Sequence, residues 1–216
     1  MKIILTGATG MVGEGVLFEC LENPIVSEIL LLSRKPSPER HPKVRELIVS
    51  DFMDIEKFSS DLIGYDACFY CAGISSIGMD EATYTQITYD TTLQVAKTLA
   101  GLNPDMVFTY VSGSHTDSSE KGNIMWARVK GKTENDLAKL AFKGVYNFRP
   151  GFMKPFKGQK NVKSILKFLI YIIPLLFPKK VLSLKQVGQA MVHAVQKGYS
   201  KSVLEIEDIK KLASVA

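Results

Sequence analysis

The residues with the clearest chemical capacity are three glycines near the N-terminus. They belong to the run Thr6-Gly7-Ala8-Thr9-Gly10-Met11-Val12-Gly13, which follows a short apolar stretch and precedes a helical pattern. Glycines let the backbone turn sharply and approach a pyrophosphate closely, and the N-terminus of a helix adds N–H donors and a positive dipole. This context makes a glycine turn without a ligand the weaker alternative. We expect a dinucleotide to be contacted here by Gly7, Thr9, Gly10, Met11, Val12 and Gly13.

The end of the second apolar run predicts which dinucleotide is bound. This run closes on Ser33-Arg34-Lys35. A site for NAD commonly has an acid at this point that binds the ribose 2′-hydroxyl, whereas an arginine accommodates the 2′-phosphate of NADP. Ser33 and Arg34 are therefore predicted cofactor contacts, and NADP(H) is favoured over NAD(H). The alternative is that Arg34 and Lys35 form a solvated loop.

The elements that must position these residues alternate along the chain. Short apolar runs predict strands at residues 2–5, 28–33, 46–50, 66–71, 106–112 and 145–149. Helical patterns separate them near Val12–Leu21, Ile55–Leu62, Glu81–Leu99 and Met125–Phe142. Strands that are apolar throughout are expected when helices cover both faces of a sheet. The alternation predicts an α/β fold, a doubly wound parallel Rossmann sheet with right-handed crossovers.

The chain length of 216 residues suits a single domain of this kind. We expect a core over residues 1–150 and a small C-terminal lobe over 151–216, because the strand–helix alternation stops after Arg149-Pro150-Gly151. In the lobe, Ser183 and Gln186 have the spacing of a capping box at the start of a helix. Residues Val203–Ile206 predict a last edge strand.

Together these motifs resemble an atypical short-chain dehydrogenase/reductase, of the NAD-dependent epimerase/dehydratase-like or NmrA-like branch. The resemblance spans about residues 1–151 and includes the three glycines, Asp51-Phe52 after the third strand and Cys71-Ala72-Gly73 after the fourth. It implies that Asp51 and Phe52 lie by the adenine and that Cys71, Ala72 and Gly73 follow the adenosine ribose. It also implies that Lys130 and Pro150 contact the cofactor, with Lys130 on the nicotinamide ribose.

The family's catalytic residues are matched only in part. Ser112 and Lys130 are present, but the tyrosine of the family's Tyr-x-x-x-Lys pair is replaced by Trp126. An indole N–H donates hydrogen bonds and cannot deliver a proton as a phenol does. Losing a positioned general acid typically costs ~10²–10⁴ in rate. Trp126 is alternatively a packing residue that closes an inactive site.

Other proton donors lie near Ser112 in the sequence, namely Tyr110, Ser114 and His115. Histidine is the residue type best suited to acid–base chemistry near neutral pH. An exposed loop histidine is the alternative for His115, and Tyr110 is expected to pack in the core. Two functions stay open: an NADP-dependent oxidoreductase or epimerase-like enzyme on a small carbonyl or hydroxyl substrate, and a non-catalytic NADP(H) sensor.

The three cysteines, Cys20, Cys68 and Cys71, are an odd number, which favours a reducing compartment over a disulfide framework. We expect a cytoplasmic protein without a secretory signal. Cys68 and Cys71 form a CxxC motif inside an apolar strand, where residues three apart face opposite sides, so we interpret them as core residues. No metal site is expected.

The positive charge is concentrated in one segment. The chain has a formal charge of +5, and residues 151–180 contain seven lysines and no acid. Within this segment, the apolar stretch 165–177 is shorter than the ~20 residues that a membrane span needs. It is expected to line the substrate pocket, to bury in a homodimer interface, or to contact a bilayer surface as part of residues 154–180. Nucleic-acid binding is not expected, since no recognition motif accompanies the lysines.

Overall fold

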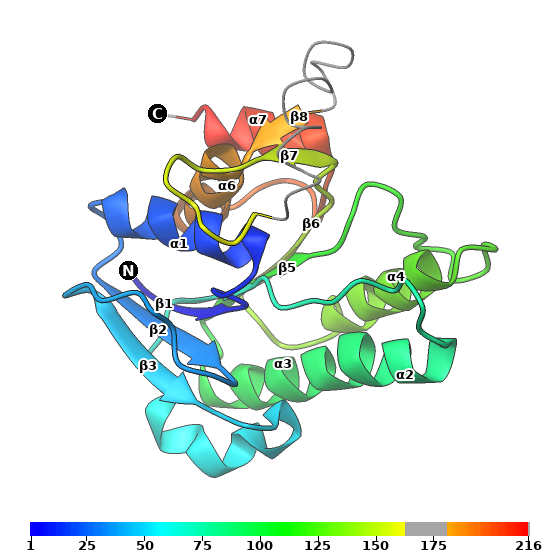
Figure 1. The fold of residues 1–216 in the computed structure, drawn as a ribbon, viewed down its shortest axis with the longest axis horizontal. Coiled ribbons are helices and arrows are strands. Elements are labelled where there is room, and N and C mark those ends of the chain that lie inside the picture. Colours follow the sequence, from blue (N-terminus) through cyan, green and yellow to red (C-terminus); the bar gives the residue numbers. More distant parts are fainter. Residues whose placement is uncertain (163–180, 216) are drawn as a thin grey trace.

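The computed structural model describes residues 1–162 and 181–215, and its centre is a seven-stranded parallel sheet (Figure 1). The strands have the order β3-β2-β1-β4-β5-β6-β9, and every neighbouring pair runs parallel. Their bounds are β1 (Lys2–Thr6), β2 (Glu28–Ser33), β3 (Val44–Ile48), β4 (Ala67–Tyr70), β5 (Val107–Val111), β6 (Gly144–Phe148) and β9 (Val203–Leu204). The predicted doubly wound Rossmann fold is confirmed.

Helices cover both faces of this sheet (Figure 1). One layer contains α1 (Met11–Glu22), α6 (Leu184–Lys197) and α7 (Ile206–Ala213). The other contains α2 (Glu81–Thr85), α3 (Thr91–Leu102), α4 (Met125–Leu137) and a 3-10 helix, η1 (Phe52–Asp61). Because the strand order reverses between β1 and β4, the crevice outside the carboxyl ends of these strands is the expected ligand position of such a fold.

The apolar strands supply two hydrophobic cores, one on each side of the sheet. Ile3 and Leu5 of β1 pack with α1 and α6, whereas Ile4 packs with α3 on the opposite face. The CxxC cysteines divide in the same way. Cys68 is buried in the core beside α3, and Cys71 packs against the core beside α1. Their interpretation as packing residues on opposite faces is confirmed.

Three predicted helices have different bounds in the structure. The helix predicted over 81–99 is divided by a π-helical segment, η2 (Gln86–Asp90), between α2 and α3. The element predicted at 55–62 is η1, which begins at Phe52 because the Asp51 side chain accepts a hydrogen bond from Met53 N. The helix predicted to reach Phe142 ends at Leu137, and the Phe142 ring instead stacks on Phe108 of β5.

The described residues of the C-terminal lobe add three strands and two helices to the Rossmann core. A separate parallel pair, β7 (Phe152–Lys154) and β8 (Val181–Ser183), precedes α6, and the predicted capping box of Ser183 and Gln186 is confirmed. The predicted edge strand is β9, but it ends at Leu204 because Glu205 caps α7. The apolar stretch 165–177 lies outside the described residues. Within the described part of the chain, no helix has the length and apolar character needed to cross a membrane.

Candidate cofactor site

The turn after β1 is packed so closely that only glycine fits at two of its positions. Gly7 has a φ of +73°, and a Cβ there would lie 2.6 Å from the backbone nitrogen of Ala72. A Cβ at Gly13 would lie 2.1 Å from the carbonyl oxygen of Gly7. The buried Thr6 hydroxyl completes the contact by accepting hydrogen bonds from the backbone N–H groups of Cys71 and Ala72, each at 3.1 Å. The ends of β1 and β4 and the start of α1 are thereby held together.

The N-terminus of α1 has donors suited to an anion. Its N-cap residue is Gly10, which makes no side-chain capping bond, and its backbone nitrogen donates to Gly7 O at 2.9 Å. The first N–H groups of any helix have no partner within the helix, and they carry the positive end of its dipole. Met11, Val12 and Gly13 form this first turn. These N–H groups are the kind of donor that binds phosphate oxygens in other proteins.

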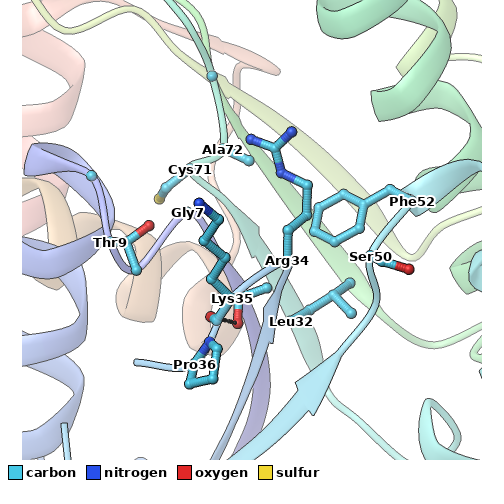
Figure 2. Close-up of a pocket in the computed structure, with 13 residues that line it drawn as sticks. Gly7, Thr9, Leu32, Arg34, Lys35, Pro36, Ser50, Phe52, Cys71 and Ala72 are labelled. Carbon is cyan, nitrogen blue, oxygen red and sulfur yellow. Dashed lines mark hydrogen bonds between the residues drawn. The ribbon is translucent and has the colours of Figure 1, made fainter. Parts of the chain in front are cut away.

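A cavity of about 730 Å³ opens beside this turn (Figure 2). Its thirteen lining residues are Gly7, Thr9, Gly10, Leu32, Ser33, Arg34, Lys35, Pro36, Ser50, Phe52, Cys71, Ala72 and Gly73. A second cavity of about 390 Å³ shares several of them and adds Asp51, Tyr70 and the start of α3. A Cβ at Gly73 would meet nothing within 4 Å, so this residue faces open space. The volumes fall in the range of small-molecule sites, and the lining fits a dinucleotide.

Among the described residues, Arg34 and Lys35 are the two cations that line the larger cavity. Both follow β2, both are exposed, and Figure 2 shows their side chains extending into the pocket. Arg34 lines both cavities, with the Phe52 ring beside it. Among the described residues that line the larger cavity there is no Asp or Glu. The only carboxylate on the smaller one is Asp51, again counting described residues, and it accepts the bond from Met53 N.

The structure thus gathers most of the predicted cofactor contacts around these cavities. The exceptions, which line neither cavity, are Met11, Val12, Gly13, Lys130 and Pro150. The first three of these form the first turn of α1. Lys130 lies on α4, and its ammonium donates to the carbonyl oxygen of Ser112 at 2.7 Å. Burial lowers the pKa of Lys130 to about 8, and the nearby Glu134 carboxylate opposes this shift. Lys130 is consequently anchored at the carboxyl end of β5.

Trp126 lies one helical turn before Lys130, and its ring lies near Gly113, the residue after Ser112. Its ring carbon Cζ3 is 3.5 Å from the point that a Cβ of Gly113 would occupy. The indole therefore covers the turn that follows β5. Residue 126 therefore lies near Lys130 and the segment that follows Ser112, as the family resemblance implies. The side chain at this position is an indole ring, which has no hydroxyl.

The hydroxyl of Ser112 has a structural partner that the sequence reasoning missed. It is buried, and it donates to Glu134 Oε1 at 2.5 Å and to the carbonyl oxygen of Phe148 at 3.2 Å. Glu134 is 1% exposed and forms an ion pair with Arg149 at 2.5 Å. One feature of the sequence points to Glu134, namely its spacing in Lys130-x-x-x-Glu134. Residues four apart share one face of a helix, so Glu134 is expected on the same face as Lys130.

The other two candidate donors lie in contrasting surroundings. Tyr110 is fully buried in β5, where burial raises the pKa of its phenol well above the usual value, so it is the core residue that we expected. His115 is exposed on the turn after β5, and its Nδ1 lies 3.0 Å from the Ser114 hydroxyl. Within residues 1–162 and 181–215, no group of three or more His, Cys, Asp or Glu could hold a metal ion.

Comparison with curated proteins finds relatives of similar sequence. Leucinostatins biosynthesis cluster protein T of Purpureocillium lilacinum is 28% identical over 80% of this chain and 63% of its own length. Protein HTATIP2 of Rattus norvegicus is 25% identical over 70% of this chain and 62% of its own length. The chain therefore spans less than two thirds of either protein. The mitochondrial protein FMP52-1 of Scheffersomyces stipitis is 25% identical over 93% of this chain and 91% of its own length.

Solved structures show the same fold. WbmF of Bordetella bronchiseptica in complex with NAD⁺ gives a TM-score of 0.67 at 17% identity, covering 99% of this chain and 76% of that one. UDP-glucuronic acid 4-epimerase of Bacillus cereus in complex with NAD gives 0.66 at 15% identity, covering 100% and 85%. The sequence model of the NAD dependent epimerase/dehydratase family matches residues 3–135. With this match over more than half of its residues, the chain belongs to the NAD dependent epimerase/dehydratase family.

Proposed function

We propose that this protein binds NADP(H) in the two adjoining cavities and acts as an oxidoreductase or epimerase-like enzyme on a small carbonyl or hydroxyl compound. The observation that carries the cofactor preference is Arg34, which extends into a cavity whose described lining has no acid. A guanidinium there would pair with the 2′-phosphate in two hydrogen bonds, and Lys35 would add a second positive charge.

Each part of the site has a distinct task in this proposal. The first turn of α1 would bind the pyrophosphate, and Asp51 and Phe52 would lie by the adenine. Lys130 would hold the nicotinamide ribose, as the family resemblance implies. When bound, the nicotinamide supplies or accepts the hydride. Because an indole cannot release a proton at neutral pH, Trp126 would orient or shield the substrate, and the proton must come from another group.

A second function, a non-catalytic NADP(H) sensor, is favoured by two contacts. The Ser112 hydroxyl is directed at Glu134, and the Trp126 ring covers Gly113. Both side chains occupy positions that the family uses for proton transfer, and here both have packing partners. Such a protein would change its affinity for a partner with the redox state of the bound cofactor.

One experiment separates the two functions. Oxidation of NADPH is followed with a panel of aldehydes, ketones and quinones, and NADPH binding is measured calorimetrically on the same preparation. Binding with turnover of at least one substrate supports the enzyme. Binding of NADPH without turnover of any substrate in the panel would contradict the enzymatic function and support the sensor. Failure to bind NADPH would overturn both.

The cellular context is also a proposal. We infer a cytoplasmic location from the three free cysteines, although the FMP52 relatives carry the word mitochondrial in their names. Contact of residues 154–180 with anionic membranes is proposed from their lysines. Co-sedimentation with anionic vesicles that salt reverses would support this contact, and no binding at low ionic strength would remove it. A homodimer is the remaining proposal, to be tested by analytical ultracentrifugation.

A further inference from the structure

We propose that Ser114 and His115 form the proton-donating pair of this protein, in place of the tyrosine that the family uses. The inference rests on the proposed enzymatic function. The inference names the side chains that would donate the proton when residue 126 is a tryptophan.

The pair lies on a turn that is fixed on both sides. Ser112 N donates to Phe148 O at 2.9 Å, and Ser114 N donates to Pro150 O at 3.1 Å. Thr116 N then closes the turn on Gly113 O at 3.0 Å. These bonds join the turn after β5 to the end of β6, so the side chain of Ser114 starts from a defined backbone position.

This turn is also at the correct edge of the sheet. β5 pairs with β4 in parallel register, from Ala67 opposite Val107 to Tyr70 opposite Tyr110. The residues that follow β4 line the larger cavity. Because the carboxyl ends of parallel strands meet at one edge, the turn that holds Ser114 is at the same sheet edge as the cofactor cavity and follows the strand next to β4.

Two residues of α4 enclose the turn where the family's phenol would act. Lys130 binds the carbonyl oxygen of Ser112, and the Trp126 ring lies against Gly113. Ser114 is the next residue along the chain. Ser114 therefore directly follows Ser112 and Gly113, the two residues near which the side chains of Lys130 and Trp126 lie.

Of the two serines on this turn, only Ser114 has a partner that can pass on a proton. The buried Ser112 hydroxyl donates to Glu134, which is itself held by Arg149. The half-buried Ser114 hydroxyl lies 3.0 Å from His115 Nδ1, and His115 is exposed. An exposed imidazole can exchange protons with water.

The proposed step is balanced in atoms and electrons. Bound NADPH would supply the hydride that adds to the carbonyl carbon of the substrate, leaving NADP⁺. The carbonyl oxygen takes the hydroxyl proton of Ser114, and the Ser114 oxygen takes a proton from Nδ1 of protonated His115. The neutral imidazole then regains a proton from water. The reverse sequence serves oxidation of an alcohol.

The test uses the full chain with NADPH and the carbonyl substrate found in the panel above. We expect Ser114→Ala and His115→Gly each to lower kcat by ~10²-fold or more, the usual contribution of a general acid. Ser114→Thr keeps the hydroxyl and should retain most of the activity. Added imidazole should restore turnover to His115→Gly. Ser119→Ala, which removes a hydroxyl bonded to Asp117 on the same loop, serves as the matched control and should leave kcat unchanged.

Measuring the affinity for NADPH distinguishes two outcomes: that Ser114 and His115 are not the proton donors, and that the protein is not an enzyme. All four variants should bind NADPH as the wild type does. Full activity of both Ser114→Ala and His115→Gly would overturn the pair and leave the enzyme in place. A loss in His115→Gly that imidazole does not restore would also count against the pair. A wild type that binds NADPH and turns over no substrate would overturn the enzyme and the pair together.

Discussion

The Ser112 hydroxyl donates a 2.5 Å hydrogen bond to Glu134, and this bond connects the end of β5 to a buried ion pair. The partner in that pair, Arg149, also lies 3.3 Å from Glu205 and donates to Ser118 at 2.5 Å. A single network therefore joins β5, α4, the end of β6 and the N-cap of α7. The carbonyl oxygen that holds Lys130 belongs to the same Ser112, so the network fixes the backbone on which the proposed chemistry depends.

Removing the charge of Glu134 should destabilise the fold strongly. Glu134→Gln leaves the Arg149 cation without its main buried partner, and breaking such a pair typically costs about 3–5 kcal/mol. Glu205→Gln removes the half-exposed partner of the same arginine and should cost less than about 1 kcal/mol. Urea unfolding of the two variants measures the difference. Equal and small losses of unfolding free energy in the two variants would mean that the buried pair contributes little to stability.

Restoring a phenol at position 126 should raise activity. In Trp126→Tyr the new hydroxyl would lie one turn before Lys130, whose positive charge favours the ionised phenol. We expect a gain of up to ~10²-fold in turnover of carbonyl substrates. Trp126→Phe, which lacks the hydroxyl, is the matched control. A gain in neither variant, with a stability loss on the order of 1 kcal/mol, would identify Trp126 as a packing residue.

Much of the fold follows from local pattern. The apolar strands and the glycine turn are specified by residues close together in the sequence, which is why their order and the cavity position could be predicted. The division of the helix at 86–90 could not, since no Pro or Gly marks it. Helix α7 was missed although Glu205 and Asp208 have capping-box spacing and Ile206, Ile209 and Leu212 share one face.

The residues of the site could be predicted where the ends of the strands determine their positions. They could not be predicted where a position depends on hydrogen bonds between side chains distant in the sequence. Gly7, Gly10 and Arg34 reach the cavity because the strands that carry them end there. The direction of the Ser112 hydroxyl depends on Glu134, whose carboxylate forms an ion pair with Arg149. Ser112 and Arg149 are far from Glu134 in the sequence. The spacing of Lys130 and Glu134 places the carboxylate on the helix face of the lysine, but it does not indicate that the Ser112 hydroxyl donates to it.

The buried ammonium of Lys130 should make stability depend on pH. Its pKa of about 8 in the folded protein lies below the ordinary 10.5. Between these pH values the unfolded chain binds more protons, so the folded state gains stability as pH rises. Relative to Lys130→Met, we expect the wild type to gain about 1–3 kcal/mol across this window. Urea unfolding at several pH values measures this gain. Lys97→Met, at an exposed lysine of α3, should show no such trend relative to the wild type.

Arg34 should set the preference for the phosphorylated cofactor. Arg34→Ala removes the guanidinium that would pair with the 2′-phosphate. The difference in binding free energy between NADPH and NADH should narrow by ~1.5–3 kcal/mol, the usual contribution of a charged hydrogen-bonded contact. Arg45→Ala removes the same charge from β3, where Arg45 pairs with Glu28, and should leave the preference unchanged. Calorimetric titration of both variants with both cofactors provides the comparison.

The most direct test of the account is a calorimetric titration of the wild-type protein with NADPH and, separately, with NADH at the same ionic strength. The central claim is that the cavity beside the glycine turn selects the 2′-phosphate through Arg34 and Lys35. It predicts that NADPH binds at least about tenfold more tightly, which corresponds to ~1.4 kcal/mol. Equal affinities for the two cofactors, or tighter binding of NADH, would contradict it.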